Sequence, residues 1–313
     1  MPLRKAIFFL VFLLMTACFC VPGAFAAQKT VGVVFSGDLP RYQEAQKAFM
    51  ATLARAGFGQ GKVSVYVQTP NPDPMSWTNS IRKFIGIQAD VIVAYGAGAA
   101  TTAVKETSRI PVVFAYVYDP AACGSKRANS TGVSSKVPMV TLLRMMKSIK
   151  PFTRLAVFYN PYEKDSEVQW NEATKIAPAL RFSPLSVQVK NPQAAKSMAQ
   201  KTAADCIYLS CSAAVDKDAS GIIAASDRRK IPVIAQVSGI VEKGGLLSLA
   251  PSPDEQGADA AMIVAKILKG IPVSSIGMEG ARKINLVVNL KAANTLSIKV
   301  PFDVLNAATK VIK

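Results

Sequence analysis

Histidine is absent from the 313 residues of this chain. Its absence excludes Ser-His-Asp and Cys-His catalysis, histidine general bases and the usual zinc sites. Acidic residues are also scarce, since 20 Asp and Glu stand against 37 Lys and Arg, a formal charge of +17. That excess favours association with anionic ligands or an anionic membrane surface, although a scattered, solvated lysine surface is the simpler interpretation. No basic tract carries interleaved aromatic residues, so we expect no nucleic acid partner.

Cysteine is scarce as well, with five residues in the whole chain. Cys206 and Cys211 lie on one predicted strand about 16 Å apart, beyond disulfide reach. Cys123 and Cys211 both fall near strand ends and could meet, but the spacing is not that of a disulfide scaffold, and we expect buried free thiols. Gly96 and Gly98 lack the third glycine of a dinucleotide fingerprint. The sequence therefore predicts no NAD, no other cofactor and no metal site.

The N-terminus has the organisation of a secretory signal peptide. Arg4 and Lys5 precede an apolar run over residues 6–15, and Ala24-Phe25-Ala26 forms an A-x-A cleavage site. We expect cleavage after Ala26 and a periplasmic protein, whose formal charge falls to +15 because Arg4 and Lys5 are lost. Two alternatives are a lipid anchor at Cys18, within an imperfect lipobox, and an uncleaved membrane anchor.

Strands and helices alternate through two successive stretches of the chain. This alternation predicts an α/β protein with two Rossmann-like, doubly wound lobes. The strand at 112–117 is almost entirely apolar, as a parallel strand covered on both faces would be. Expected strands are 30–35, 63–67, 90–94, 112–117, 131–134, 155–159, 185–189, 207–209, 232–235 and 283–290. Expected helices are 42–56, 75–87, 99–107, 140–149, 166–177, 192–203, 215–229, 254–269, 291–296 and 302–311.

The chain is predicted to pass between these lobes several times. The first lobe is expected to comprise residues 27–132 and 251–282, and the second lobe residues 133–250 and 283–313. Several passes imply a hinge of several strands, and the cleft between two hinged lobes is the default ligand site. Ligands in open α/β sheets bind beyond the carboxyl ends of the strands, so the strand tips are the site candidates.

A set of motifs then resembles one bacterial family. The order of these motifs is that found in the substrate-binding proteins of ABC transporters, in the TrpX-like group. The motifs are IPVVFAYVYDP, STGVS, LAVFYNPYEKDS, IYLSCSAAV and INLVVNLKAANTLSIKVP. The resemblance implies the type I periplasmic binding protein fold, a small solute, a membrane permease as partner and a monomer. The sequence departs from that group at 236–238 and 252–254, which bears on the identity of the solute.

The resemblance and the strand tips together give the ligand residues that we expect. Tyrosines at strand ends suit an aromatic ring or a sugar face, and the first turn of the helix after Gly98 suits a carboxylate. Asp119 and Glu163 are candidates to meet an ammonium group, although Asp119 is equally suited to capping the turn at Pro120. The expected ligand residues are Ser36, Asp38, Tyr95, Gly96, Gly98, Thr101, Tyr116, Tyr118, Asp119, Asn160, Tyr162, Glu163, Ser166, Ser210, Ser212 and Gln236.

These observations predict an exported receptor of an ABC uptake system that closes over an aromatic or other amino acid. One alternative is the ligand-binding component of a membrane sensor. Another is an α/β enzyme in which Asp38 and Asp119 act as paired carboxylates. The presence of an export signal and the absence of a nucleophile motif both argue against an enzyme.

Overall fold

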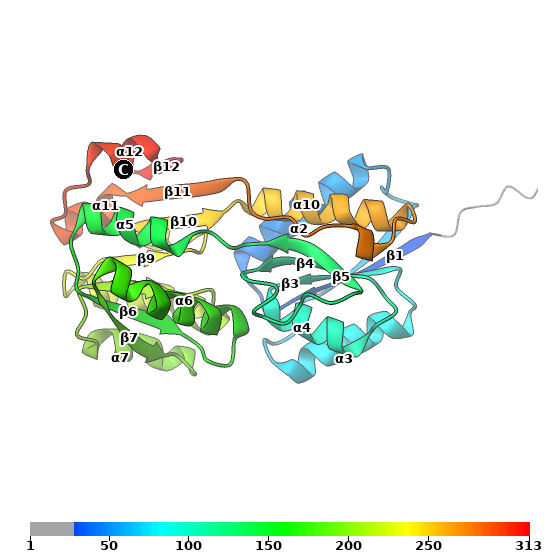
Figure 1. Ribbon diagram of the computed structural model, residues 1–313, viewed down its shortest axis with the longest axis horizontal. Coiled ribbons are helices and arrows are strands. Elements are labelled where there is room, and N and C mark those ends of the chain that lie inside the picture. The colour runs from blue at the N-terminus through cyan, green and yellow to red at the C-terminus, as the bar shows by residue number, and fades with distance from the viewer. Residues whose placement is uncertain (1–27) are drawn as a thin grey trace, which may run out of the picture.

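The computed structural model describes residues 28–313, so the predicted signal peptide and Cys18 lie outside the described residues. It contains two sheets, one in each of two lobes that lie end to end along the long axis (Figure 1). The five-stranded sheet of the first lobe is parallel throughout, in the order β2-β1-β3-β4-β5. The sheet of the second lobe has the order β12-β11-β10-β9-β8-β6-β7, and only its β10–β11 pair is antiparallel. The α/β architecture with two doubly wound lobes is thus confirmed.

In the first lobe, helices cover both faces of the sheet. The helices α2 and α10 pack on one face, while α3 and α4 pack on the other, because β1, β3 and β4 are apolar on both sides. Its elements are β1 (Lys29–Phe35), α2 (Pro40–Arg55), β2 (Val63–Gln68), α3 (Pro74–Gly86), β3 (Val91–Tyr95), α4 (Ala97–Glu106), β4 (Val112–Val117), β5 (Ser130–Ser134) and α10 (Pro253–Leu268).

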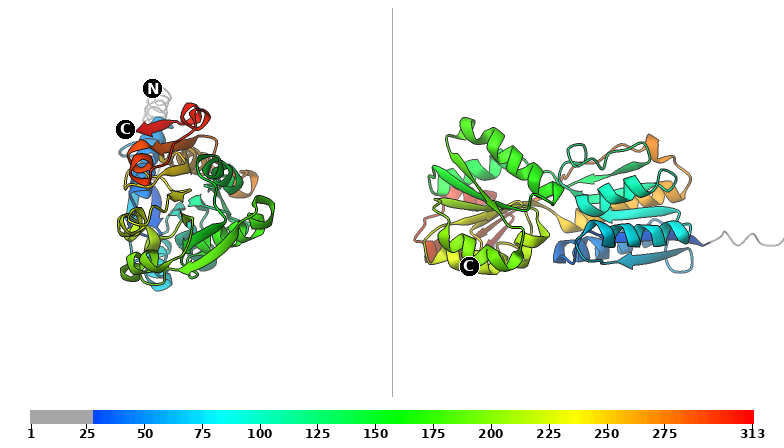
Figure 2. Two further views of the ribbon diagram at one scale, coloured as in Figure 1. Left: turned by 90° about the vertical axis from the view of Figure 1, so that its left-hand side faces the viewer. Right: turned by 90° about the horizontal axis from the view of Figure 1, so that it is seen from below.

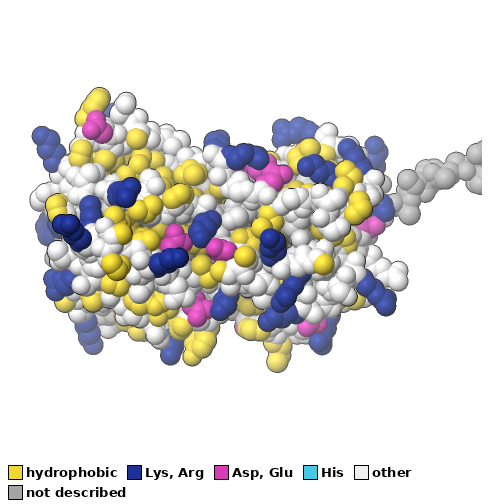
Figure 3. All heavy atoms as spheres, in the orientation of Figure 1, with side chains coloured by type: hydrophobic (Ala, Val, Ile, Leu, Met, Phe, Trp, Pro, Cys, Tyr) yellow, Lys and Arg dark blue, Asp and Glu magenta, His cyan; other side chains and the backbone are white. Residues whose placement is uncertain are grey.

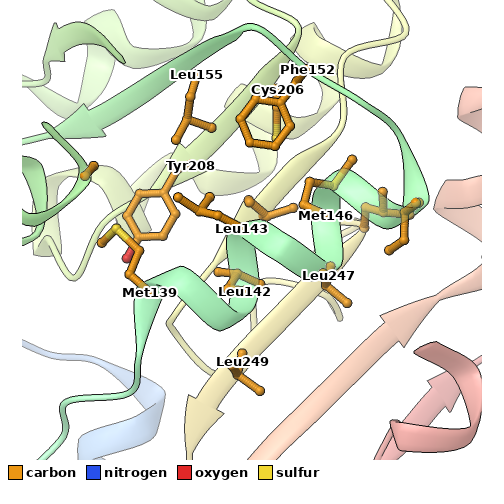
Figure 4. Packing of buried hydrophobic residues seen from close by; sticks show 14 of the residues in the cluster. Met139, Leu142, Leu143, Met146, Phe152, Leu155, Cys206, Tyr208, Leu247 and Leu249 are labelled. Atoms are coloured by element: carbon orange, nitrogen blue, oxygen red, sulfur yellow. The ribbon is translucent and has the colours of Figure 1, made fainter. Parts of the chain in front are cut away.

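The second lobe is built in the same way around its own core. Met139, Leu142, Leu143 and Met146 of α5 pack against side chains of the sheet such as Tyr208 (Figure 4). Its elements are α5 (Met139–Ile149), β6 (Arg154–Tyr159), α6 (Lys164–Leu180), β7 (Ser183–Gln188), α7 (Pro192–Lys201), β8 (Cys206–Leu209), α8 (Ala213–Lys217), α9 (Ala219–Asp227), β9 (Val233–Ala235), β10 (Leu247–Pro251), β11 (Ile284–Asn289), α11 (Leu290–Leu296), α12 (Phe302–Ala307) and β12 (Lys310–Ile312).

Three segments carry the chain between the lobes, and the right-hand view of Figure 2 shows the junction from below. They follow β5, follow β10, and precede β11 after a short 3₁₀ helix at Val273–Ser275. The lobe boundary expected after residue 132 falls inside β5, which belongs wholly to the first sheet. The second expected boundary, between residues 250 and 251, falls one residue before the end of β10 at Pro251.

Two predicted helices differ from the structure. The helix expected over 215–229 is divided into α8 and α9 at Asp218, whose carboxylate accepts the backbone N–H of Lys196 on α7. The helix expected over 302–311 ends at Ala307, and Lys310–Ile312 pairs with β11 as a parallel strand. Val311 and Ile312 are β-branched, and a free sheet edge is available to them, so strand pairing wins over helix.

Candidate ligand-binding site between the lobes

A cavity of about 420 Å³ lies between the two lobes. This volume falls in the range of pockets that enclose small molecules. Both lobes contribute to its walls, so the cavity is complete only when they are together. The residues that carry the argument below are Ser36, Tyr42, Trp77, Gly98 and Thr101 of the first lobe and Tyr162, Glu163, Asp165 and Cys211 of the second.

The N-terminus of α4 forms one end of the cavity. Gly96 precedes the helix with a φ of +83°, and the Tyr42 hydroxyl and Ser36 Oγ occupy the space that a side chain at Gly96 would need. Ser36 Oγ accepts the backbone N–H of Ala99 at 2.9 Å. Within residues 28–313, neither the Gly98 N–H nor the Tyr42 hydroxyl has a hydrogen-bond partner. Free donors at a positive helix end are suited to binding a carboxylate.

Aromatic side chains form the adjoining wall. Tyr42 and Trp77 are buried, with 5% and 8% of their surfaces exposed, while Tyr162 is largely exposed. The Trp77 ring lies directly against Gly98, since a Cβ at that position would be 2.7 Å from ring atoms Cζ2 and Cζ3. Behind the wall, Tyr42 packs against Tyr95 and Tyr116 with ring centroids 5.9 and 5.7 Å away. This wall offers flat apolar area to a planar ring.

Two buried carboxylates connect the lobes beside the cavity. Asp165 of α6 accepts the backbone N–H groups of Ala97 and Tyr118 at 3.0 and 2.7 Å, and burial raises its pKa to about 6. Asp216 of α8 forms an ion pair with Arg41 of α2. Burial alone would raise the pKa of Asp216, but Arg41 and Lys243 hold it below its usual value. Both contacts depend on the lobes being together.

Five of the expected ligand residues line the cavity: Ser36, Gly98, Thr101, Tyr162 and Glu163. The Glu163 carboxylate accepts from the Ser212 hydroxyl and from the backbone N–H groups of Ala213 and Ala214, so it caps α8. A buried network behind it joins Asn160, Ser166 and Ser210, because Ser166 Oγ contacts both the Asn160 N–H and Ser210 Oγ at 2.8 Å. These serines hold the loop tips of the second lobe together.

The other expected residues do not line this cavity. Tyr95 and Tyr116 lie in the core of the first lobe, and Gly96 lies beneath the Tyr42 hydroxyl. The buried Tyr118 hydroxyl donates toward Glu172 and Gln236 of the second lobe, at 2.9 and 3.2 Å. These tyrosines therefore support the cavity wall or the lobe contact from behind.

The two carboxylates of the enzyme alternative lie in different places. Asp119 caps the turn by accepting the Ala122 N–H and pairs with Lys136. Asp38 accepts from Gln43 and lines an adjoining cleft of about 870 Å³, which Asp119 does not line. The structure thus gives these carboxylates no shared site for acid and base chemistry.

Sequence reasoning missed Arg41, Tyr42 and Trp77. All three belong to the helices that follow β1 and β2, where the helical spacing of apolar residues such as Tyr42 and Trp77 indicates core positions. Tyr42 lies in the first turn of α2, just beyond the carboxyl end of β1, and that position was the available signal. Cys123, Cys206 and Cys211 are free; the first two are buried, as expected, while Cys211 is half-buried. Burial raises the pKa of Cys211 to about 12, so that thiol is held in its protonated form.

The surface is basic without a single concentrated patch on the visible face. Lys and Arg side chains are spread over both lobes there and are interrupted by acidic ones (Figure 3). None of the helices within residues 28–313 has the length and apolar character needed to cross a membrane.

Two hinged α/β lobes that enclose a small-molecule cavity define a two-lobed solute-binding protein of the type I fold. Residues 30–312 match the family model described as "ABC transporter substrate binding protein", and the chain belongs to that family. Proteins of this family bind small solutes outside the cytoplasm and work with ABC permeases.

Individual relatives agree with this assignment. A "Tyrosine-binding protein" from Clostridioides difficile is 22% identical over 284 residues, which cover 87% of this chain and 82% of that protein. A conserved domain protein from Vibrio cholerae has a TM-score of 0.85 at 28% identity, over 91% of this chain and 99% of that one. An ABC domain in complex with L-Trp from Streptococcus pneumoniae has the same TM-score at 21% identity, over 91% of this chain and 100% of that one.

Proposed function

We propose that this protein is the receptor of an ABC uptake system for a zwitterionic aromatic amino acid, and that it releases the solute unchanged. The observation that carries the proposal is a cavity between the lobes whose aromatic wall meets a helix N-terminus with free donors. We further propose that the protein is exported by its N-terminal signal peptide and acts as a monomer in the periplasm.

The cavity offers a separate group for each part of such a solute. The Gly98 N–H and the Tyr42 hydroxyl are placed to receive the carboxylate at the N-terminus of α4. Tyr42 and Trp77 give the ring a flat surface, and Tyr162 stands at the rim. Glu163, whose carboxylate lines the cavity, supplies the negative charge for the ammonium group. An aromatic solute also agrees with the tyrosine-binding relative and with the neighbour solved with L-Trp.

A thermal-shift screen tests the class of solute. Purified mature protein is expected to be stabilised by L-tyrosine or L-tryptophan, because a ligand that binds only the folded state raises the melting temperature. Ribose, myo-inositol and nucleosides serve as the comparison panel, since they lack the paired carboxylate and ammonium groups. Stabilisation by a sugar or nucleoside and by no amino acid would exclude our assignment of the solute.

Replacing Tyr42 with phenylalanine tests the carboxylate subsite. We expect about tenfold weaker binding of L-tyrosine with unchanged folding, because a hydrogen bond to a charged group is lost while the ring remains. Tyr95→Phe is the matched comparison, since the Tyr95 hydroxyl is also unpartnered but does not line the cavity. Isothermal titration calorimetry of both variants measures the difference. Equal affinities of the two variants for L-tyrosine would show that the Tyr42 hydroxyl does not contact the solute.

A further inference from the structure

Asp165 extends from the second lobe into the first. It lies in the first turn of α6 and is buried, with 7% of its surface exposed. Its Oδ2 accepts the backbone N–H of Ala97 at 3.0 Å, and its Oδ1 accepts the backbone N–H of Tyr118 at 2.7 Å. The Cys123 thiol donates to Oδ1 at 3.4 Å. All three donors belong to the first lobe, so the carboxylate joins the lobes through its whole set of hydrogen bonds.

The local chain conformation of the first lobe presents these donors. Ala97 is the first residue of α4, where a backbone N–H has no acceptor within its own helix. Tyr118 follows the end of β4, where the register with β5 shifts and Tyr116 adopts a φ of +57°. A left-handed residue other than glycine costs about 1–2 kcal/mol, and the neighbouring Gln256 side chain accepts the Tyr116 N–H and holds the bend. The strained tip thereby leaves the Tyr118 N–H for an acceptor outside the sheet.

The positive ends of two helices also meet at this junction. The helices α4 and α6 contact each other, and Asp165 lies in the first turn of α6 while it binds the first N–H of α4. Both helix N-termini carry partial positive charge, which would repel across a dry interface. The acceptor oxygens of Asp165 between the two ends offset that repulsion, although burial is the larger effect on the carboxyl group and raises its pKa.

We propose that Asp165 is an interlobe latch, a positioning residue that holds the lobes together and fixes the first turn of α4 against the cavity. When the lobes separate, water replaces Asp165 at Ala97, Tyr118 and Cys123, so these contacts belong to the closed arrangement alone. The latch acts on the solute through α4, because Gly98, the next residue after Ala97, presents the free N–H. Only the solute measurements below depend on the proposed function.

Asp165→Asn tests the latch, because the amide keeps one accepting oxygen while its NH₂ group faces the other backbone N–H as a second donor, which opposes closure without affecting the open form. Hydrogen exchange of the Ala97 and Tyr118 amides is expected to accelerate at least about tenfold, measured with and without L-tyrosine. L-Tyrosine should bind about tenfold more weakly, chiefly through faster dissociation. Asp90→Asn is the matched control, since Asp90 accepts the Thr30 N–H and the Lys29 ammonium within one lobe.

The pH profile supplies a readout that a merely structural residue would not change. The titratable or charged groups that face Asp165 are Arg41 and Tyr42 of α2, Cys123 after β4 and Cys211 after β8. Burial raises the pKa values of Tyr42 and both thiols further above neutrality, and the chain has no histidine. Asp165 is therefore the one group of this set that titrates between pH 5 and 7.

Burial between the lobes raises the pKa of Asp165 from the usual 3.8 to about 6. If separation of the lobes returns the carboxyl to water, closure takes up a proton. Affinity for L-tyrosine is expected to increase up to about tenfold as the pH falls from 7 to 5, and Asp165→Asn should flatten this profile. A protonated Asp165 can still hold the lobes together, because the oxygens of a neutral carboxyl group, unlike an amide nitrogen, still accept hydrogen bonds.

If the Ala97 and Tyr118 amides exchange alike in wild type and Asp165→Asn, the latch is refuted. If exchange accelerates but neither protein binds L-tyrosine, the latch stands and the proposed solute fails.

Discussion

Replacing Gly98 with alanine is expected to weaken L-tyrosine binding by about 10- to 100-fold while the protein stays folded. The new Cβ would lie 2.7 Å from two ring atoms of Trp77, and that ring is packed in the core between α3 and α4. Either the ring shifts or the first turn of α4 moves, and each change alters the cavity. Overpacking of this kind costs about 1–3 kcal/mol in the folded protein. Binding is weakened because the displaced turn of α4 no longer presents the Gly98 N–H to the carboxylate.

Calorimetric titration of Gly98→Ala with L-tyrosine measures this loss. Gly86→Ala is the control, because Gly86 also lies in a helix and its added Cβ would have no neighbour within 4 Å. Alanine is a better helix former than glycine, so a loss at Gly98 cannot be attributed to helix propensity. An affinity within twofold of wild type would show that the contact between Trp77 and Gly98 does not shape the site.

A second large effect is expected on stability, at Gly257 of α10. A Cβ on Gly257 would overlap the carbonyl oxygen of Ala45 and lie 3.0 Å from its Cα, so α2 and α10 touch backbone to backbone. Backbone cannot move aside as a flexible side chain can. Gly257→Ala should therefore lower the free energy of unfolding of the first lobe by about 3 kcal/mol.

Urea denaturation of Gly257→Ala, followed by circular dichroism, measures this change, with Gly86→Ala again as the control. We expect the control to equal or slightly exceed the stability of the wild type. A Gly257→Ala protein as stable as the wild type would mean that the two helices are not packed as closely as the structure places them.

The fold was predictable because its signals are local. Buried strands such as 91–95 and 112–117 are continuous apolar runs, and α10 has an apolar face at helical spacing. The errors occur where distant residues decide the outcome. Lys310–Ile312 becomes a strand because β11 presents a free edge to it, and α8 separates from α9 at Asp218, whose carboxylate binds the backbone of α7. Neither partner is adjacent in sequence.

The site was only partly predictable. The rule that ligands bind beyond strand ends leads to Ser36, Gly98 and Tyr162, which do line the cavity. It does not separate tyrosines that face a cavity from those that face a core, because Tyr95 and Tyr116 occupy equivalent strand ends and pack inward.

Conversely, Tyr42 and Trp77 have the helical spacing of core residues, and both are buried. They line the cavity as well, because the other lobe closes over them. The facing of two lobes is a long-range property. No local pattern in the sequence shows which helix surfaces the two lobes will bring together around one cavity.

A crystal structure of the mature protein grown with L-tyrosine tests the central claim most directly. The account predicts one solute molecule between the closed lobes, with its carboxylate at the Gly98 N–H and its ring beside Trp77. Saturating L-tyrosine that leaves this cavity empty, or binds away from both lobes' facing surfaces, would contradict it.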